Sequence, residues 1–193
     1  MYGGRLEANF HVVVGQVSSI RNVGRCIKSS GLDLSDITLE PVASANAVLS
    51  QEEKEAGVAM IDIGGGTSEI AVIALGGIVC DKSIRVAGDD FTTDIEEYMR
   101  RQHNILVGER TAEAIKINVG AAISELQDPP ADYAVQGRDL MTGIPKEIVI
   151  SYTEVAHALD KTISKIEEAI LSALEMTPPE LSADIYKTGI YLA

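Results

Sequence analysis

Residues 57–77 place a carboxylate, three consecutive glycines and two hydroxyl side chains between two apolar segments. Glycine carries no Cβ atom and tolerates positive φ, so the backbone amides of such a loop can approach a bound oxyanion closely. Phosphate is the natural ligand, the hydroxyls add donors, and the carboxylate is placed to hold a hydrated magnesium ion. The residues predicted to do this are Asp62, Gly64, Gly65, Gly66, Thr67 and Ser68.

This loop matches neither of two common phosphate motifs. No lysine followed by Ser or Thr comes after the glycines, as a Walker loop requires, and a strand follows where a dinucleotide fingerprint has a helix. A plain hairpin turn is the simpler alternative, since glycine runs also occur in ordinary turns. The carboxylate, the glycines and the threonine in one strand-to-strand setting favour the phosphate loop.

The elements around the loop predict an α/β fold. The apolar segments on its two sides are predicted to be strands, and residues 82–88 a third, with glycine-bearing turns that favour an antiparallel meander. A helix is expected from about Asp90 to His103, and residues 133–139 and 146–152 form a plausible hairpin. Other expected elements are a helix over 109–123 with Ile123 inward, a long helix from Ser151, a short element from Thr177 and a buried strand from Gly189.

The first 56 residues predict mixed elements of their own. Residues 10–14 are predicted to be a buried strand, and a helix from about Ser18 is expected to end at a left-handed cap on Gly31. A strand over residues 36–44 ending at Glu40-Pro41, a short helix over 43–50 and an acidic loop over 51–57 complete this part.

Composition excludes several functions. The formal net charge of −13, without a cluster of Lys and Arg, argues against nucleic-acid binding and against direct contact with an anionic membrane. No signal peptide or apolar segment of spanning length is recognised, so a soluble cytoplasmic protein is expected. Cys26 and Cys80 are expected to be buried free thiols, and no catalysis is assigned to His11, His103 or His157.

The stretch "IDIGGGTSEIAVI" resembles the second phosphate motif of the superfamily of actin, heat-shock chaperones and sugar kinases. With "SIRVAGDDF", "YMRRQHNILVGERTAEAIK", "GRDLMTGIPKEI" and "PPELSADIYKTGIYL", residues 57–192 resemble the bacterial actin family MreB, whereas residues 4–67 resemble the division protein family FtsA. The resemblance implies an actin-like ATPase fold of the ribonuclease H-like type, mainly its second half. Residues 57–108 and 161–193 would form subdomain IIA, residues 109–160 the inserted subdomain IIB, and residues 1–56 the end of the first half.

The same resemblance implies site roles. Asp62 would lie near the magnesium, and Gly64 to Thr67 would wrap the β- and γ-phosphates of ATP. Glu40 would orient the attacking water, since phosphoryl transfer depends on positioning, and Thr67 would also take part in catalysis. A solvated carboxylate is the alternative for Glu40. Gly88 and Asp89 would form the tight turn that flanks the nucleotide cleft, with a plain turn as the alternative. Glu113 and Lys116 would approach ribose and adenine, with an ordinary surface ion pair as the alternative.

Two classes of function follow from the resemblance. One is an ATP-binding, filament-forming cytoskeletal protein that acts with cell-shape or division machinery and reaches the membrane through partners. The other is a truncated or chimeric remnant without nucleotide turnover, because an N-terminal phosphate strand and an adenine-contacting loop have no counterpart in these residues. We therefore expect weak binding of Mg-ATP and no significant turnover by this chain alone, since each ~1.4 kcal/mol of lost contact weakens binding tenfold.

Overall fold

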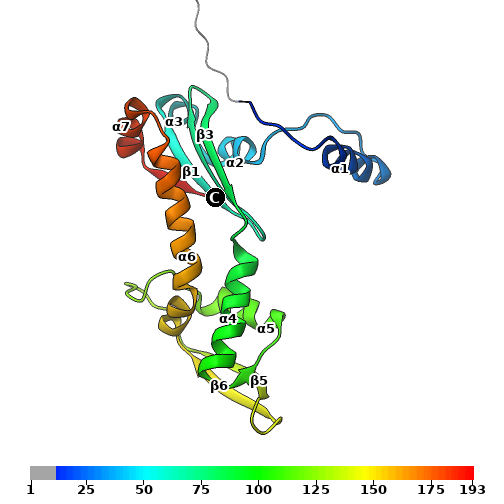
Figure 1. Cartoon of the computed structure of the whole chain (residues 1–193), viewed down its shortest axis with the longest axis vertical. Coiled ribbons are helices and arrows are strands. Elements are labelled where there is room, and N and C mark those ends of the chain that lie inside the picture. The colour runs from blue at the N-terminus through cyan, green and yellow to red at the C-terminus, as the bar shows by residue number, and fades with distance from the viewer. Residues whose placement is uncertain (1–11) are drawn as a thin grey trace, which may run out of the picture.

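Two β-sheets joined by long helices form the part of the chain that the structure, a computed structural model, describes: residues 12–193 (Figure 1). The first sheet has the strand order β3-β2-β1-β7 and the second has the order β4-β5-β6. The strands are β1 (Val58–Ile63), β2 (Ser68–Ala74), β3 (Gly77–Ile84), β4 (Ile105–Leu106), β5 (Tyr133–Asp139), β6 (Pro145–Ile150) and β7 (Ile190–Leu192).

The predicted antiparallel meander is confirmed in the first sheet. β1 pairs with β2, and β2 pairs with β3, both antiparallel, while β7 adds to β1 in parallel. The pair Ile63 and Ser68 closes the β1–β2 hairpin, so the glycine loop lies at its tip. β3 begins at Gly77, earlier than predicted, because Leu75 and Gly76 both have positive φ and turn the chain in two residues.

Four helices follow the meander: α4 (Gly88–Gln102), α5 (Glu109–Val119), α6 (Tyr152–Glu175) and α7 (Pro179–Thr188). The long helix α6 begins directly after Ser151, as predicted. The Ser151 hydroxyl accepts from the amide of Glu154, while the Glu154 carboxylate accepts from the amide of Ser151, so the two residues cap the helix reciprocally. α5 ends at Val119, and Ile123 is 58% exposed, so its predicted inward position is wrong.

Side-chain alternation along β1 gives the first sheet two covered faces. Val58 and Met60 pack with Ala45 and Leu49, from the helix α2 (Glu40–Val48) and the residue after it. Ile61, on the opposite face, packs against Ala169 and Ala173 of α6 together with Ile70. Asp62 follows Met60 by two residues and therefore points to the α2 face.

The second sheet has its own core, formed with α4, α5 and the first turns of α6. Its strands pair antiparallel, which confirms the predicted hairpin of β5 and β6. The predicted inserted subdomain, residues 109–160, supplies only part of this core, because α4, which precedes it, also contributes buried residues. The buried residues of this core are Ile95, Met99, Ile105, Val107, Ala112, Ile115, Val119, Val135, Ile150, Val155 and Leu159.

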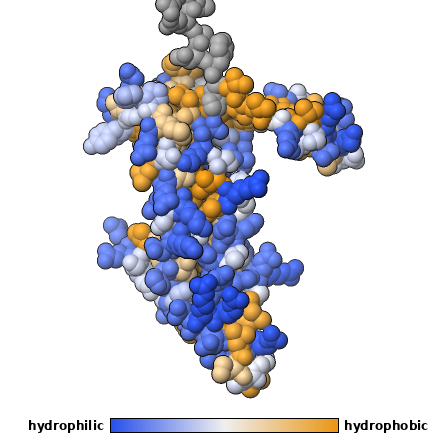
Figure 2. All heavy atoms as spheres, in the orientation of Figure 1, coloured by the Kyte–Doolittle hydropathy of each residue, from blue (hydrophilic) through white to orange (hydrophobic). Residues whose placement is uncertain are grey.

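The N-terminal part departs most from expectation. Phe10 and His11 of the predicted first strand lie outside the described residues, and residues 12–14 form no strand and are exposed. The helix α1 (Val17–Ser29) forms as predicted, and Gly31 has a φ of +78°, but no residue of α1 is buried. Its side chains Val17, Ile20 and Val23 are exposed, on an arm beside the first sheet (Figures 1 and 2).

Two further predictions for residues 36–57 are wrong. Instead of a strand ending at Pro41, α2 begins at Glu40, because proline fits the first turn of a helix where its missing N–H is not needed. The acidic segment is not a loop but the helix α3 (Gln51–Ala56), which Ser50 and Glu53 cap reciprocally.

Burial of the cysteines and of the last strand was also predicted wrongly. Cys26 is exposed because it belongs to α1, and Cys80 is only partly buried, although both are free thiols as expected. β7 borders the first sheet, so Ile190 and Leu192 remain 49% and 69% exposed. Within residues 12–193, none of the helices has the length and apolar character that crossing a membrane requires.

Candidate functional site

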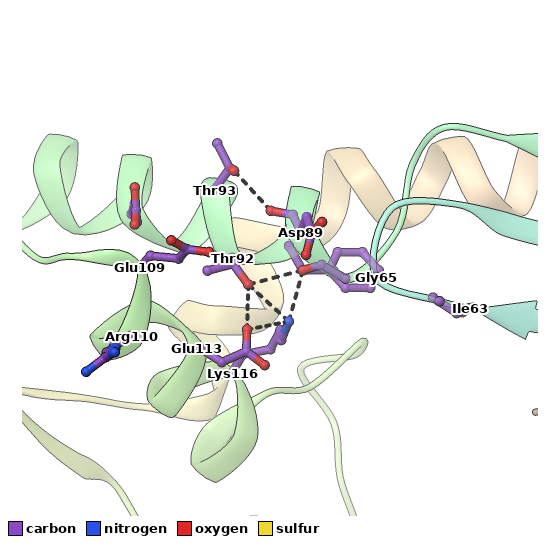
Figure 3. A pocket seen from close by; sticks show the side chains of 13 residues that line it. Ile63, Gly65, Asp89, Thr92, Thr93, Glu109, Arg110, Glu113 and Lys116 are labelled. Atoms are coloured by element: carbon purple, nitrogen blue, oxygen red, sulfur yellow. Dashed lines mark hydrogen bonds and ion pairs between the residues drawn. The ribbon is translucent and has the colours of Figure 1, made fainter. Parts of the chain in front are cut away.

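A cavity of about 1060 Å³ opens where the tip of the β1–β2 hairpin meets α4 and α5 (Figure 3). The hairpin tip supplies glycines, the start of α4 supplies hydroxyls and an aspartate, and α5 supplies charged side chains. The lining residues are Ile63, Gly64, Gly65, Gly88, Asp89, Phe91, Thr92, Thr93, Glu96, Glu109, Arg110, Glu113 and Lys116.

The glycine loop is docked onto the start of α4 through backbone hydrogen bonds. The amide of Gly64 donates to the carbonyl of Thr67 (2.9 Å), which closes the loop. The amide of Gly88 donates to the carbonyl of Gly64 (3.1 Å), and that of Asp89 to the carbonyl of Gly65 (2.7 Å). The first amides of α4 are therefore used to hold the loop and are not available to an anion.

The loop's own amides remain available. Among the described residues, no protein acceptor takes the amide hydrogens of Gly65, Gly66 or Thr67. Successive unpaired N–H groups in a turn form a concave site for an anion. The chemistry predicted for the glycine run from the sequence is thus compatible with its hydrogen bonding.

Gly88 is closely packed in this docked arrangement. A Cβ atom on it would lie 3.2 Å from the carbonyl oxygen of Gly64 and 3.6 Å from Nζ of Lys116. Gly88 is the first residue of α4, so the predicted tight turn is instead a helix start. Its carbonyl accepts from Lys116 Nζ at 2.9 Å, which ties α5 to the same point.

A polar network centred on Thr92 joins α4 to α5 below the loop. The Thr92 hydroxyl lies 2.8 Å from Oε2 of Glu113 and accepts from Nζ of Lys116 at 3.0 Å. Lys116 and Glu113 are themselves paired at 2.7 Å. Hydrogen bonds from Lys116, and then from Thr92, lower the pKa of Glu113 below its usual value, so this carboxyl is ionised at neutral pH.

The cavity carries more negative than positive charge. Four of its lining residues are acidic and two are basic: Asp89, Glu96, Glu109 and Glu113 against Arg110 and Lys116. The Asp89 carboxylate lies beside the loop, within 3.7–3.9 Å of where Cβ atoms of Gly65 and Gly66 would be. An anion on the loop would therefore need a cation near it, because like charges repel.

Asp62 lies at the end of β1 on the opposite side of the strand from Ile63, and it does not line the cavity. Its Oδ2 accepts from the hydroxyl of Ser44 in α2 at 2.5 Å. No cluster of three or more metal-binding side chains exists among residues 12–193. A single carboxylate fits magnesium, which keeps most of its waters and binds through one or two carboxylates plus phosphates.

The predicted site residues thus divide into two groups. Those that line the cavity are Gly64, Gly65, Gly88, Asp89, Glu113 and Lys116. Those that lie outside its lining are Glu40, Asp62, Gly66, Thr67 and Ser68.

Glu40 and Ser68, which lie outside the cavity lining, differ in their exposure to solvent. Glu40 is exposed at the first turn of α2, one turn before Ser44. Ser68 is fully buried, and its hydroxyl donates to the carbonyl of Val86 at 2.7 Å. Because that single proton is already used, Ser68 is removed from the proposed phosphate donors.

Sequence reasoning missed Thr92, which connects the residues it did identify. Thr92 lies 21 and 24 positions before its partners Glu113 and Lys116, so no local spacing indicated the contact. His103, for which no role was predicted, bonds Oε1 of Glu154 at 2.9 Å at the far end of α4. That pair supports the helix ends and does not line the cavity.

Comparisons with known proteins give the family. The sequence model described as MreB/Mbl protein matches residues 11–193. The cell shape-determining protein Mbl of Bacillus subtilis (strain 168) is 40% identical over 153 residues, which cover 79% of this chain and 45% of Mbl. The cell shape-determining protein MreB of Escherichia coli (strain K12) is 39% identical over the same length, covering 79% and 44%.

Solved structures give the same fold. The crystal structure of MreB5 of Spiroplasma citri bound to AMPPNP superimposes with a TM-score of 0.84 at 34% identity, covering 93% of this chain and 53% of that one. The MamK filament matches with a TM-score of 0.66 at 17% identity, which supports the actin-like fold alone. This chain spans about half the length of the relatives it matches.

The family match also covers most of the segment that resembles FtsA. One MreB/Mbl model extends from residue 11 through the glycine motif, so an FtsA-like origin of residues 4–67 stays an expectation. The predicted actin-like fold is confirmed by the structural neighbours. From the family match, the relatives and the shared fold together, we conclude that this chain belongs to the MreB/Mbl family of actin-like cell-shape proteins.

Proposed function

We propose that this chain binds ATP with magnesium in the cavity between the glycine loop, α4 and α5. One observation carries the proposal: the loop that offers unpaired amides opens into the same cavity as the Glu113–Lys116 pair. AMPPNP and ADP are bound in structures of MreB5, which supports a nucleotide as the ligand.

Each part of the nucleotide has proposed partners. The β- and γ-phosphates accept from the amides of Gly65, Gly66 and Thr67. Glu113 and Lys116 contact the ribose and adenine, and Lys116 exchanges one of its three internal hydrogen bonds for the nucleotide. Asp62 binds water of the magnesium shell, whose chemistry is to neutralise phosphate charge. Glu40 orients the attacking water, with the Thr67 side chain next to the γ-phosphate.

The excess negative charge of the cavity makes magnesium important for binding. Phosphates beside Asp89 experience repulsion, which a divalent cation offsets. We therefore expect the chain to bind the magnesium complex of the nucleotide and to bind free nucleotide much more weakly.

The proposal extends to assembly and cell shape. MreB/Mbl relatives are cell shape-determining proteins, and a structure of MamK is that of a filament. We propose that the protein self-associates into filaments, acts with cell-shape machinery in the cytoplasm, reaches the membrane through partners and binds no nucleic acid. Sedimentation with and without Mg-ATP tests the assembly part, and nucleotide-dependent pelleting is the expected result.

The nucleotide part is tested by measuring the binding of AMPPNP by calorimetry in excess magnesium chloride. Lys116→Ala removes three contacts of the Nζ atom at once, to Gly88, Thr92 and Glu113. We expect it to weaken binding at least about tenfold, since one hydrogen bond from this charged group to the nucleotide would contribute about 1.5–3 kcal/mol.

Lys146→Ala is the matched control, because this lysine also pairs with a carboxylate, Asp139, at 3.6 Å but lies outside the cavity. It should bind AMPPNP like the unchanged protein. Equal affinity of all three proteins, or no binding by the unchanged protein up to millimolar nucleotide, would contradict the proposed site.

A further inference from the structure

The hydrogen bond between Ser44 and Asp62 joins two elements that are separate in the sequence. Ser44 lies in α2 and Asp62 at the end of β1, 18 residues later, and the Ser44 hydroxyl donates to Oδ2 of Asp62 at 2.5 Å. Within residues 12–193, the other carboxylate oxygen, Oδ1, accepts from no protein donor. One oxygen of Asp62 is thus fixed and the other is available.

The helix that carries Ser44 is held firmly against the sheet. Ala45 is 2% exposed and packs in one cluster with Met60 of β1, while Pro41 is buried one turn earlier. Met60 and Asp62 share a face of β1 because side chains alternate along a strand. The Ser44 hydroxyl is therefore presented to the carboxylate by a packed helix and not by a mobile loop.

We propose that Ser44 is a positioning residue for the magnesium ion that accompanies ATP, and that it acts through Asp62. By donating to Oδ2, Ser44 holds the carboxylate in one orientation and leaves Oδ1 to accept from a water of the hydrated ion. The inference rests on the proposed function, because it concerns the cation of that same site.

The position of Ser44 gives this contact a second consequence. Glu40 precedes Ser44 by four residues, so both side chains lie on one face of α2. Fixing α2 to β1 through the Ser44–Asp62 bond also fixes the helix that carries the proposed water-orienting glutamate. The single helix α2 then positions both the proposed magnesium-binding carboxylate, Asp62, and the proposed water-orienting carboxylate, Glu40.

The expected effect is moderate. Partners that orient a direct metal ligand change metal affinity by about 10–100-fold. Because Asp62 is proposed to contact the ion through water, we expect Ser44→Ala to raise the half-saturating magnesium concentration by about threefold to tenfold, the lower part of that scale. Nucleotide affinity without magnesium should stay unchanged.

The experiment measures AMPPNP binding by calorimetry over a series of magnesium concentrations and in EDTA. Ser44→Thr keeps a hydroxyl and should restore the magnesium dependence of the unchanged protein. Gln136→Ala is the control, because Gln136 also donates to a carboxylate, Oε2 of Glu147 at 2.9 Å, on the β5–β6 hairpin and outside the cavity. It should behave like the unchanged protein.

The outcomes separate this inference from the proposed function. A raised magnesium requirement in Ser44→Ala alone, with EDTA affinity unchanged, supports the inference. An unchanged requirement, or an equal loss of affinity with and without magnesium, overturns it. If the unchanged protein binds AMPPNP equally well in EDTA, the inference falls while nucleotide binding stands; if it binds no AMPPNP, both fall.

Discussion

Thr92→Val is the sharpest test of the network that joins α4 to α5. Valine keeps the β-branched shape of this 5% exposed residue and replaces its hydroxyl with a methyl group. That hydroxyl contacts Glu113 at 2.8 Å, Lys116 at 3.0 Å and the Gly88 carbonyl in its own helix at 3.1 Å. Hydrogen bonds to charged groups contribute about 1.5–3 kcal/mol each. Glu113 is 45% and Lys116 21% exposed, so water replaces part of the loss, and we expect destabilisation of about 1–2 kcal/mol.

Thermal unfolding followed by circular dichroism measures this change. For a protein of this size, 1 kcal/mol shifts Tm by about 2–4 °C, so Thr92→Val should lower Tm by about 2–8 °C. Thr93→Val is the matched control, because the Thr93 hydroxyl is exposed and bonds only the Asp89 carbonyl in its own helix at 3.0 Å. Equal Tm values for the two variants would refute the role assigned to the Thr92 network.

Two other substitutions test separate parts of the structure. Gly137→Ala would place a Cβ atom 2.2 Å from Cγ2 of the buried Ile105, so we expect the free energy of unfolding, measured in urea, to fall by about 3 kcal/mol. Gly77→Ala is the control, because its Cβ atom would meet nothing closer than 3.9 Å. A similar cost for both substitutions would contradict the packing argument. For Glu113, hydrogen bonds from Lys116 and then Thr92 lower the folded pKa below the usual 4.5. The resulting stabilisation is fully present above pH 4.5 and disappears as pH falls through the lowered pKa. The Tm difference between the unchanged protein and Glu113→Gln should therefore shrink in acid. A Tm difference independent of pH would show that the pair does not lower this pKa.

The parts of the fold that sequence predicted depend on local patterns. The hairpin around the glycine loop has two apolar strands separated by four residues, and the long helix from Ser151 has a regular apolar stripe, so both could be recognised without tertiary information. The glycine run was likewise identifiable as a phosphate loop. Its docking onto α4 could not be foreseen, because it depends on the carbonyl groups of Gly64 and Gly65.

The failures have two different physical causes. For α3, the capping signal was present in Ser50 and Glu53, but the segment lacks an apolar stripe, so its polarity was interpreted as a loop. For Cys26 and β7, hydrophobic character predicted burial, yet burial depends on what packs against the segment. Within residues 12–193, no residue of α1 is buried, and β7 lies at the edge of its sheet.

The candidate site was predictable residue by residue but not as a network. Glu113 and Lys116 are three positions apart, and the sequence placed them on one helix face. The contacts of Ser44 with Asp62 and of Thr92 with Glu113 instead join residues that are 18 and 21 positions apart in the sequence. Contacts of this length become visible only when the helices are placed against the sheet.

The alternation of side chains along β1 explains why the proposed site needs helices from both faces of the sheet. Asp62 points to the α2 face and meets Ser44, whereas the cavity opens beside Ile63 and is lined by α4 and α5. A ligand on the loop between these faces would therefore have its cation positioned from one side and its phosphates and sugar from the other. Substitutions on the α2 face should change mainly the magnesium requirement, while those in the cavity should change nucleotide affinity at any magnesium concentration.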